Sequence, residues 1–167
     1  MLDSNTSRPT VPAAASAPDL SAVKTTQQFA AQVITRADLS RKASKVAVDR
    51  LTNAAAKEFA GYELLEAETV VQVLQDLGTV LPAMAPDTKA ALDSIVNTPT
   101  GAAFDTAYMT AEFENHAFLL ELAKAYLKNS DASSPSEATG RALGKVTVFA
   151  FTEHTGVSRR ILKELAV

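Results

Sequence analysis

The sequence predicts an all-α protein, a bundle of four long helices with one short helix between them. Apolar residues recur every three or four positions through most of the chain, the spacing of one helix face. The prolines fall between these stretches or at their starts, and nothing in the sequence supports a strand. The chain has 167 residues, 47% of them hydrophobic, which is enough to bury a single core.

The first half of the chain predicts a helical hairpin. Residues 19–78 contain no proline, and alanine, leucine and long polar residues dominate. One helix of about sixty residues would span roughly 90 Å, so we predict two, at 20–51 and 54–77, with a turn near residue 53. Gly78 ends the second helix because glycine accepts the left-handed conformation that follows a helix.

The second half predicts three more helices, at 87–96, 102–129 and 135–165. Ser134, Pro135 and Glu137 open the last of them with a helix-start signature: a serine cap, proline at the first helical position and glutamate three residues after the cap. This helix contains interior glycines, each costing about 1 kcal/mol relative to alanine. Close packing against a neighbouring helix would offset that cost.

Residues 1–19 predict a flexible tether to the 20–167 bundle domain. They are rich in proline, serine, threonine and alanine, and bury too little apolar surface to offset the entropy of ordering. The composition resembles the linker behind the lipidated cysteine of bacterial lipoproteins. We therefore expect an exported protein, periplasmic or outer-membrane-associated, with a lipid anchor upstream. An expression leader is the alternative.

Composition and the absence of known motifs argue against several classes of function. The net charge is −3 and no basic block interleaves with aromatics, so we expect no nucleic-acid partner. No apolar run reaches the roughly 18 residues of a membrane span. The absence of cysteine excludes disulfides and sulfur-ligated metals. Hydrolase, phosphate-loop and dinucleotide motifs are missing, so we expect a non-enzyme without a cofactor, with an unidentified protein partner.

Ionisable side chains on the predicted inward faces are the unusual feature. Arg36 lies near the centre of the first helix's apolar face, and Glu63 and Glu66 lie within that of the second. Buried charges must be paired, hydrogen-bonded or metal-bound. A hairpin turning near residue 53 places Arg36 opposite about residue 70. We therefore expect an ion pair of Arg36 with Glu66 first and Glu63 second.

The second half offers a candidate site for a divalent metal. Glu112 and His116 are one helical turn apart on a margin of the 102–129 face, and His154 could close the site. In the alternative without metal, His116 is half-exposed and His154 is a hydrogen-bonded core residue. His154 falls within an apolar stripe of Leu143, Val146, Ala150, Val157, Ile161 and Leu165.

Three segments carry a resemblance to a known family: AVDRLTNAAAKEFA at 47–60, AFDTAYMTAEFENH at 103–116 and VFAFTEHTGVSRRIL at 148–162. Over about 25–166 the chain resembles uncharacterised bacterial proteins, labelled exported or outer-membrane proteins, with a ferritin-like four-helix bundle. The resemblance implies two long helical hairpins, with the short helix in the crossover. It also implies an envelope protein with an interaction or stress-related role.

The chain departs from the family's pattern at two positions. Ser40 stands where the family has an acidic residue, and Ala67 where it has a histidine. A ferritin-type di-iron centre uses two Glu-x-x-His elements, and this sequence contains none. The resemblance therefore implies at most a degenerate Glu/His site, and a metal-binding bundle is the alternative to the non-enzymatic envelope protein.

Overall fold

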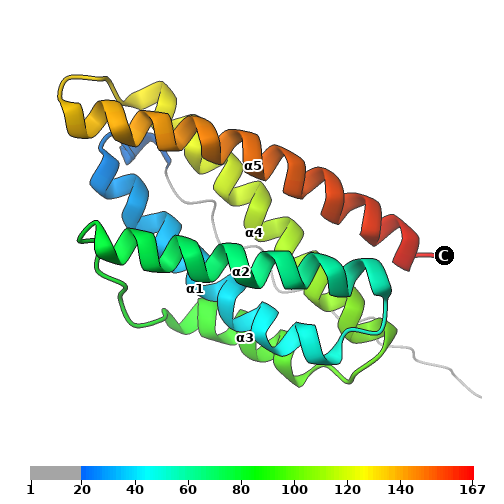
Figure 1. Ribbon diagram of the computed structural model, residues 1–167. Coiled ribbons are helices and arrows are strands. Elements are labelled where there is room, and N and C mark those ends of the chain that lie inside the picture. Colours follow the sequence, from blue (N-terminus) through cyan, green and yellow to red (C-terminus); the bar gives the residue numbers. More distant parts are fainter. Residues whose placement is uncertain (1–19) are drawn as a thin grey trace, which may run out of the picture.

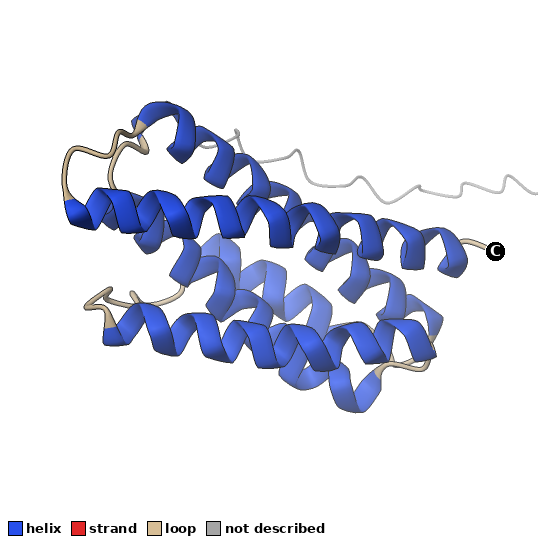
Figure 2. Ribbon diagram, turned by 45° about the horizontal axis from the view of Figure 1, so that its top comes forward, coloured by secondary structure: helices blue, strands red, loops and turns tan. Residues whose placement is uncertain are grey.

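The computed structural model describes residues 20–167, which form an all-α bundle (Figure 1). No strand occurs in this part of the chain (Figure 2). The predicted fold class is confirmed, whereas the tether predicted for 1–19 lies outside the described residues. The elements are η1 (Leu20–Ala22), α1 (Thr26–Arg50), α2 (Ala54–Asp76), α3 (Pro86–Asn97), α4 (Ala102–Asn129) and α5 (Pro135–Leu165).

Two antiparallel hairpins, α1–α2 and α4–α5, build the bundle (Figure 1). Helices α1 and α4 pack against each other in the middle, and α3 lies in the crossover against both of them. Helices α2 and α5 lie outside and contact each other only sparsely. Side-chain hydrogen bonds fix the antiparallel register of the central pair, at Thr26–Tyr126, Ser40–Glu112 and Ser44–Tyr108.

Capping residues decide where the helices begin and end. Thr25 and Gln28 form a capping box, in which the Thr25 hydroxyl accepts from Gln28 N at 3.2 Å. Helix α1 therefore begins at residue 26 rather than at the predicted 20. Ser134 caps α5 as predicted, accepting from Glu137 N at 3.2 Å. Gly78 follows α2 with a φ of +89°, the conformation that favours glycine.

The buried face of α5 differs from the predicted apolar stripe. Leu143 and Val146 are 42% and 63% exposed. Gly140 and Gly144 are buried instead: a Cβ on Gly140 would lie 2.6 Å from the Tyr126 hydroxyl. The glycines let α5 approach α4 closely, so small residues form the contact. The buried positions of α5 are Gly140, Gly144, Phe151, Thr155, Ser158 and Ile161.

Helix α2 is also rotated from its predicted orientation. Tyr62, Val73 and Leu77 are 68%, 46% and 68% exposed, although their apolar spacing along the helix places them on the same face as Phe59. Phe59 and Glu63 are buried as expected. No helix within residues 20–167 has the length and apolar character to cross a membrane.

Candidate metal centre

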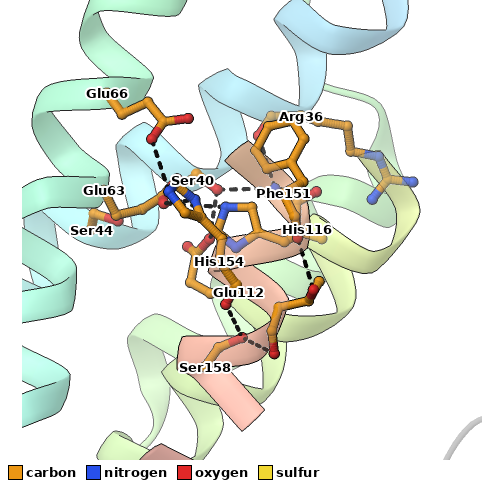
Figure 3. A network of polar contacts seen from close by, with 12 residues as sticks. Arg36, Ser40, Ser44, Glu63, Glu66, Glu112, His116, Phe151, His154 and Ser158 are labelled. Atoms are coloured by element: carbon orange, nitrogen blue, oxygen red, sulfur yellow. Dashed lines mark hydrogen bonds and ion pairs between the residues drawn. The ribbon is translucent and has the colours of Figure 1, made fainter. Parts of the chain in front are cut away.

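Five ionisable side chains from three helices meet in the bundle (Figure 3). Helix α2 supplies Glu63 and Glu66, α4 supplies Glu112 and His116, and α5 supplies His154. Residues three or four apart share one face of a helix, so each helix presents its groups together. The centre lies between the two hairpins.

Glu63 is the middle of this cluster. Its Oε2 lies 3.1 Å from His116 Nε2 and 3.7 Å from His154 Nδ1. The other ring nitrogen of His154, Nε2, is 3.3 Å from Glu66 Oε2. One ligand atom from each of Glu63, His116 and His154 lies within 4.8 Å of the others.

Burial divides the cluster into an inner and an outer part. The side chains of His116 and Glu63 are 1% and 5% exposed, whereas those of His154 and Glu66 are 21% and 34% exposed. Phe151 stacks on the His116 ring at 5.2 Å, and Phe59 meets that ring edge-on at 6.0 Å. The inner groups are thus held by aromatic contacts, and solvent reaches the centre from the side of His154 and Glu66.

Glu112 is held towards α1. The Ser40 hydroxyl donates to Glu112 Oε2 at 2.7 Å, and Asn115 Nδ2 donates to the Ser40 hydroxyl at 2.9 Å. The same Glu112 oxygen is 3.9 Å from His116 Nε2. Glu112 therefore adjoins the three-residue group but is not one of its members.

The carboxyl groups take different protonation states. Burial, reinforced by the charge of Glu63, raises the pKa of Glu112 to about 8 and that of Glu66 to about 7. Burial also opposes ionisation of Glu63, but the neighbouring His116 outweighs it and holds the pKa of Glu63 below its usual value. At neutral pH Glu63 is therefore the ionised carboxylate beside His116.

The two histidines also differ. Burial disfavours the charged form of His116, but the carboxylate of Glu63 outweighs burial and raises the pKa of this imidazole. Burial, together with the charge of His116, lowers the pKa of His154. Without a metal, a proton on His116 balances the charge of Glu63, and His154 is neutral.

Several buried polar atoms of the centre have no hydrogen-bond partner within residues 20–167. They are Glu63 Oε2, both ring nitrogens of His116, and His154 Nδ1. Glu63 Oε2 and His116 Nε2 are 3.1 Å apart, close enough for a charge interaction, but they do not have the angles of a hydrogen bond. Buried polar groups in folded proteins are nearly always satisfied, and atoms that find no partner within the protein are often the ligands of a bound ion. All four atoms belong to the three residues that could hold a metal.

The predicted ion pair of Arg36 with Glu66 or Glu63 is wrong. The Arg36 guanidinium lies 4.1 Å from the centroid of the Phe118 ring, and Figure 3 shows it turned away from the histidines. Ser40, four residues further along α1, takes the inward position instead. Sequence spacing placed Arg36 on the inner face, whereas the packing of α1 against α4 leaves it at the margin.

Two of the three predicted metal ligands, His116 and His154, belong to the observed group. His116 and His154 come together with ring centroids 5.0 Å apart, and His116 is buried rather than half-exposed. Glu63 replaces Glu112 as the nearest carboxylate. The signal that could have found Glu63 was its place within the apolar face of the second helix. Sequence reasoning assigned that carboxylate to Arg36.

Two residues of the segment 103–116, Asp105 and Tyr108, have structural roles at the start of α4. The Asp105 carboxylate accepts from the backbone N–H groups of Thr52 and Asn53 at 3.0 and 2.8 Å, which ties the α1–α2 turn to α4. The Tyr108 hydroxyl lies 2.8 Å from that of Ser44 on α1. These contacts are 50 to 70 positions apart in sequence, so the motif alone did not reveal them.

A family model described as "Domain of unknown function (DUF4142)" matches residues 9–147. The chain belongs to the DUF4142 family. The matched stretch contains Glu63 and His116 and ends before His154. No curated protein and no solved structure matches the chain.

Proposed function

We propose that this DUF4142 protein binds one divalent transition-metal ion through Glu63, His116 and His154. One observation carries the proposal: three helices bring a carboxylate oxygen and two imidazole nitrogens within 4.8 Å of one another. Atoms of the same three residues are buried without a hydrogen bond of good geometry among the described residues, although Glu63 Oε2 and His116 Nε2 are 3.1 Å apart. A cation at their centre would satisfy one atom from each.

The spacing suits a small ion such as Zn²⁺. Bonds of about 2.0–2.2 Å in a tetrahedral site separate the ligand atoms by about 3.4 Å. The separations of 3.1 Å and 3.7 Å from Glu63 Oε2 lie on either side of that value. Imidazole and carboxylate ligands are typical of zinc and of non-haem iron.

Glu66 would orient His154. When Nδ1 of His154 faces the ion, Nε2 carries the hydrogen and lies 3.3 Å from Glu66 Oε2. A carboxylate behind a ligating histidine fixes its tautomer and strengthens its ligation. Three protein ligands leave a fourth position, on the side where His154 and Glu66 meet solvent. The proposed role is metal binding without catalysis, because the sequence contains no complete catalytic motif.

An alternative without metal uses the same residues. A protonated His116 would neutralise Glu63 permanently, as a structural pair. The two hypotheses differ in the response to zinc, because metal binding requires His116 to lose the proton that balances the charge of Glu63, whereas His154 is already neutral. In the metal hypothesis the protein releases protons when zinc is added. In the structural hypothesis the protein does not bind zinc and releases no protons.

The test is a zinc titration of protein purified without a histidine tag and stripped with EDTA. We expect one Zn²⁺ per chain, a rise in melting temperature, and proton release measured in two buffers of different ionisation enthalpy. Glu63→Gln should abolish binding, whereas Glu68→Gln, exposed on the same helix, should not. No uptake at micromolar zinc, or equal binding by both variants, would contradict the proposal.

We also propose that the protein is exported to the cell envelope. The proline-, serine- and alanine-rich composition of residues 1–19 supports this, as does the resemblance to exported proteins with ferritin-like bundles. The hairpin order, with α3 in the crossover, agrees with that resemblance. Fractionation of the native cells with an antibody against the bundle tests the location. Recovery in the cytosol alone would refute it.

A further inference from the structure

A pocket of about 260 Å³ lies between α1, the segment before α3, and α4. It contains none of the three proposed metal ligands. Helix α1 contributes Arg36, the crossover contributes Leu81, Pro82 and Met84, and α4 contributes Phe118. The pocket therefore combines one cation, Arg36, with an apolar wall, and two carboxylates, Asp38 and Asp87, also line it.

Arg36 is an unsatisfied cation. Its guanidinium stacks over the Phe118 ring at 4.1 Å and is partly buried. Within residues 20–167 this guanidinium has no ion-pair partner and donates no hydrogen bond. Only the backbone carbonyl of Arg36 is used, accepting from Asn115 Nδ2 at 3.3 Å. Desolvating a charge without an anion costs free energy that a bound anion would recover.

Arg50 provides an internal comparison. It also lies over a ring, that of Phe104, at 4.1 Å. Its guanidinium, however, donates to the carbonyls of Val96 and Thr98 and to the Thr100 hydroxyl. The same stacking on an aromatic ring thus accompanies a fully engaged arginine at one place and an unengaged one at the pocket. Arg36 differs from Arg50 because no group within residues 20–167 accepts a hydrogen bond from its guanidinium.

The two acidic residues beside Arg36 are occupied elsewhere. The Asp38 carboxylate is bound by Arg41 and Lys42 at 2.5 and 2.6 Å. The Asp87 carboxylate accepts from Thr88 N at 2.8 Å at the start of α3. Asp87 acts on Arg36 only through space. Arg41 and Lys42 lie outside the pocket lining, but with them the five charged groups sum to about +1, which favours a single negative charge at Arg36.

We propose that this pocket binds an organic monocarboxylate with a short aliphatic body. The planar guanidinium of Arg36 presents paired N–H donors that match the two oxygens of a carboxylate. Leu81, Pro82 and Met84 offer the aliphatic part an apolar surface that a phosphate or sulfate would not use. The volume lies near the lower end of small-molecule sites, about 300 Å³, so the ligand is small.

Sodium octanoate, below its micellar concentration, is the probe for the full chain. Amide resonances in residues 32–38 and 81–88 should shift, whereas 1-octanol and inorganic phosphate should shift them at least tenfold more weakly. Loss of a charge-assisted pair weakens binding by about 10- to 100-fold, the effect expected for Arg36→Gln. Arg159→Gln is the matched control, because Arg159 lies over Phe113 at 5.5 Å but outside the pocket.

Met84→Glu adds a second, independent test. It places a negative charge in the apolar wall without touching Arg36, and it should weaken octanoate binding at least tenfold. Circular dichroism confirms that each variant is folded. The proposal is overturned if octanoate shifts no pocket resonance, if octanol or phosphate binds as well, or if folded Arg36→Gln keeps wild-type affinity. Zinc plays no part, so His154→Ala should bind octanoate normally.

Discussion

Replacing His116 with phenylalanine should destabilise the metal-free protein by about 3–5 kcal/mol, the usual cost of removing one partner from a buried pair. His116 Nε2 and Glu63 Oε2 are 3.1 Å apart, and their side chains are 1% and 5% exposed. Phenylalanine keeps a ring beside Phe151, which stacks on His116 at 5.2 Å. The substitution therefore removes charge while conserving most of the packing. His154, whose pKa burial lowers, is a poor substitute cation for Glu63.

The measurement is urea unfolding at pH 7 with EDTA, followed by circular dichroism. In a thermal melt of a chain of this size, 1 kcal/mol corresponds to about 2–4 °C in Tm, so the variant should melt about 6–20 °C lower than the wild type. Adding Glu63→Leu to His116→Phe removes the uncompensated charge and should recover more than half of the loss. Glu68→Leu, at an exposed site on α2, should change stability by less than about 0.5 kcal/mol. A neutral single variant, or a double variant less stable than the single one, would refute the reasoning.

Four further predictions concern pH and local packing. The raised pKa values of Glu112 and His116 mean that the folded state holds protons that the unfolded chain releases. Because burial raises the pKa of Glu112 to about 8, the metal-free protein should lose about 2 kcal/mol between pH 6.5 and 8 as the unfolded chain releases this proton. The raised pKa of His116 acts in the same direction, and a flat series of EDTA melts would exclude this. Gly140→Ala should destabilise the protein by about 1–3 kcal/mol, because its Cβ would lie 2.0 Å from a threonine hydroxyl of α1. Gly156→Ala meets open space and should stabilise by up to about 1 kcal/mol in the same melts. Asp105→Ala should cost about 2–4 kcal/mol in urea unfolding, since it leaves two backbone N–H groups of the α1–α2 turn without their acceptor; an unchanged midpoint would show that water replaces the carboxylate.

The sequence by itself determined the helices. Helices at 102–129 and 135–165 have the predicted bounds, and the second helix ends one residue before its predicted end. Prolines, glycines and caps act within a few residues of the helix end they define, so they can be read locally. The predicted start of the first helix, at residue 20, is too early because it overlooks the Thr25 cap, which is a local signal like the others.

Tertiary structure decided which faces those helices bury. Apolar periodicity locates a stripe on α5, but the buried contact with α4 runs through Gly140 and Gly144, and Leu143 and Val146 are left outside. Backbone proximity favours small residues, and no hydrophobic pattern marks where such proximity occurs. The rotation of each helix is therefore a property of the helix pair.

The same limit explains the candidate site. Each of its ionisable groups can be named from the sequence, because charges within apolar faces stand out. Their partners cannot, since a rotation of one helix by a single residue, about 100°, exchanges one neighbour for another. Helix α1 turned Ser40 inward and Arg36 to the margin. With α1 in this orientation, Glu63 lies beside the two histidines rather than beside Arg36, and Arg36 lines a separate pocket.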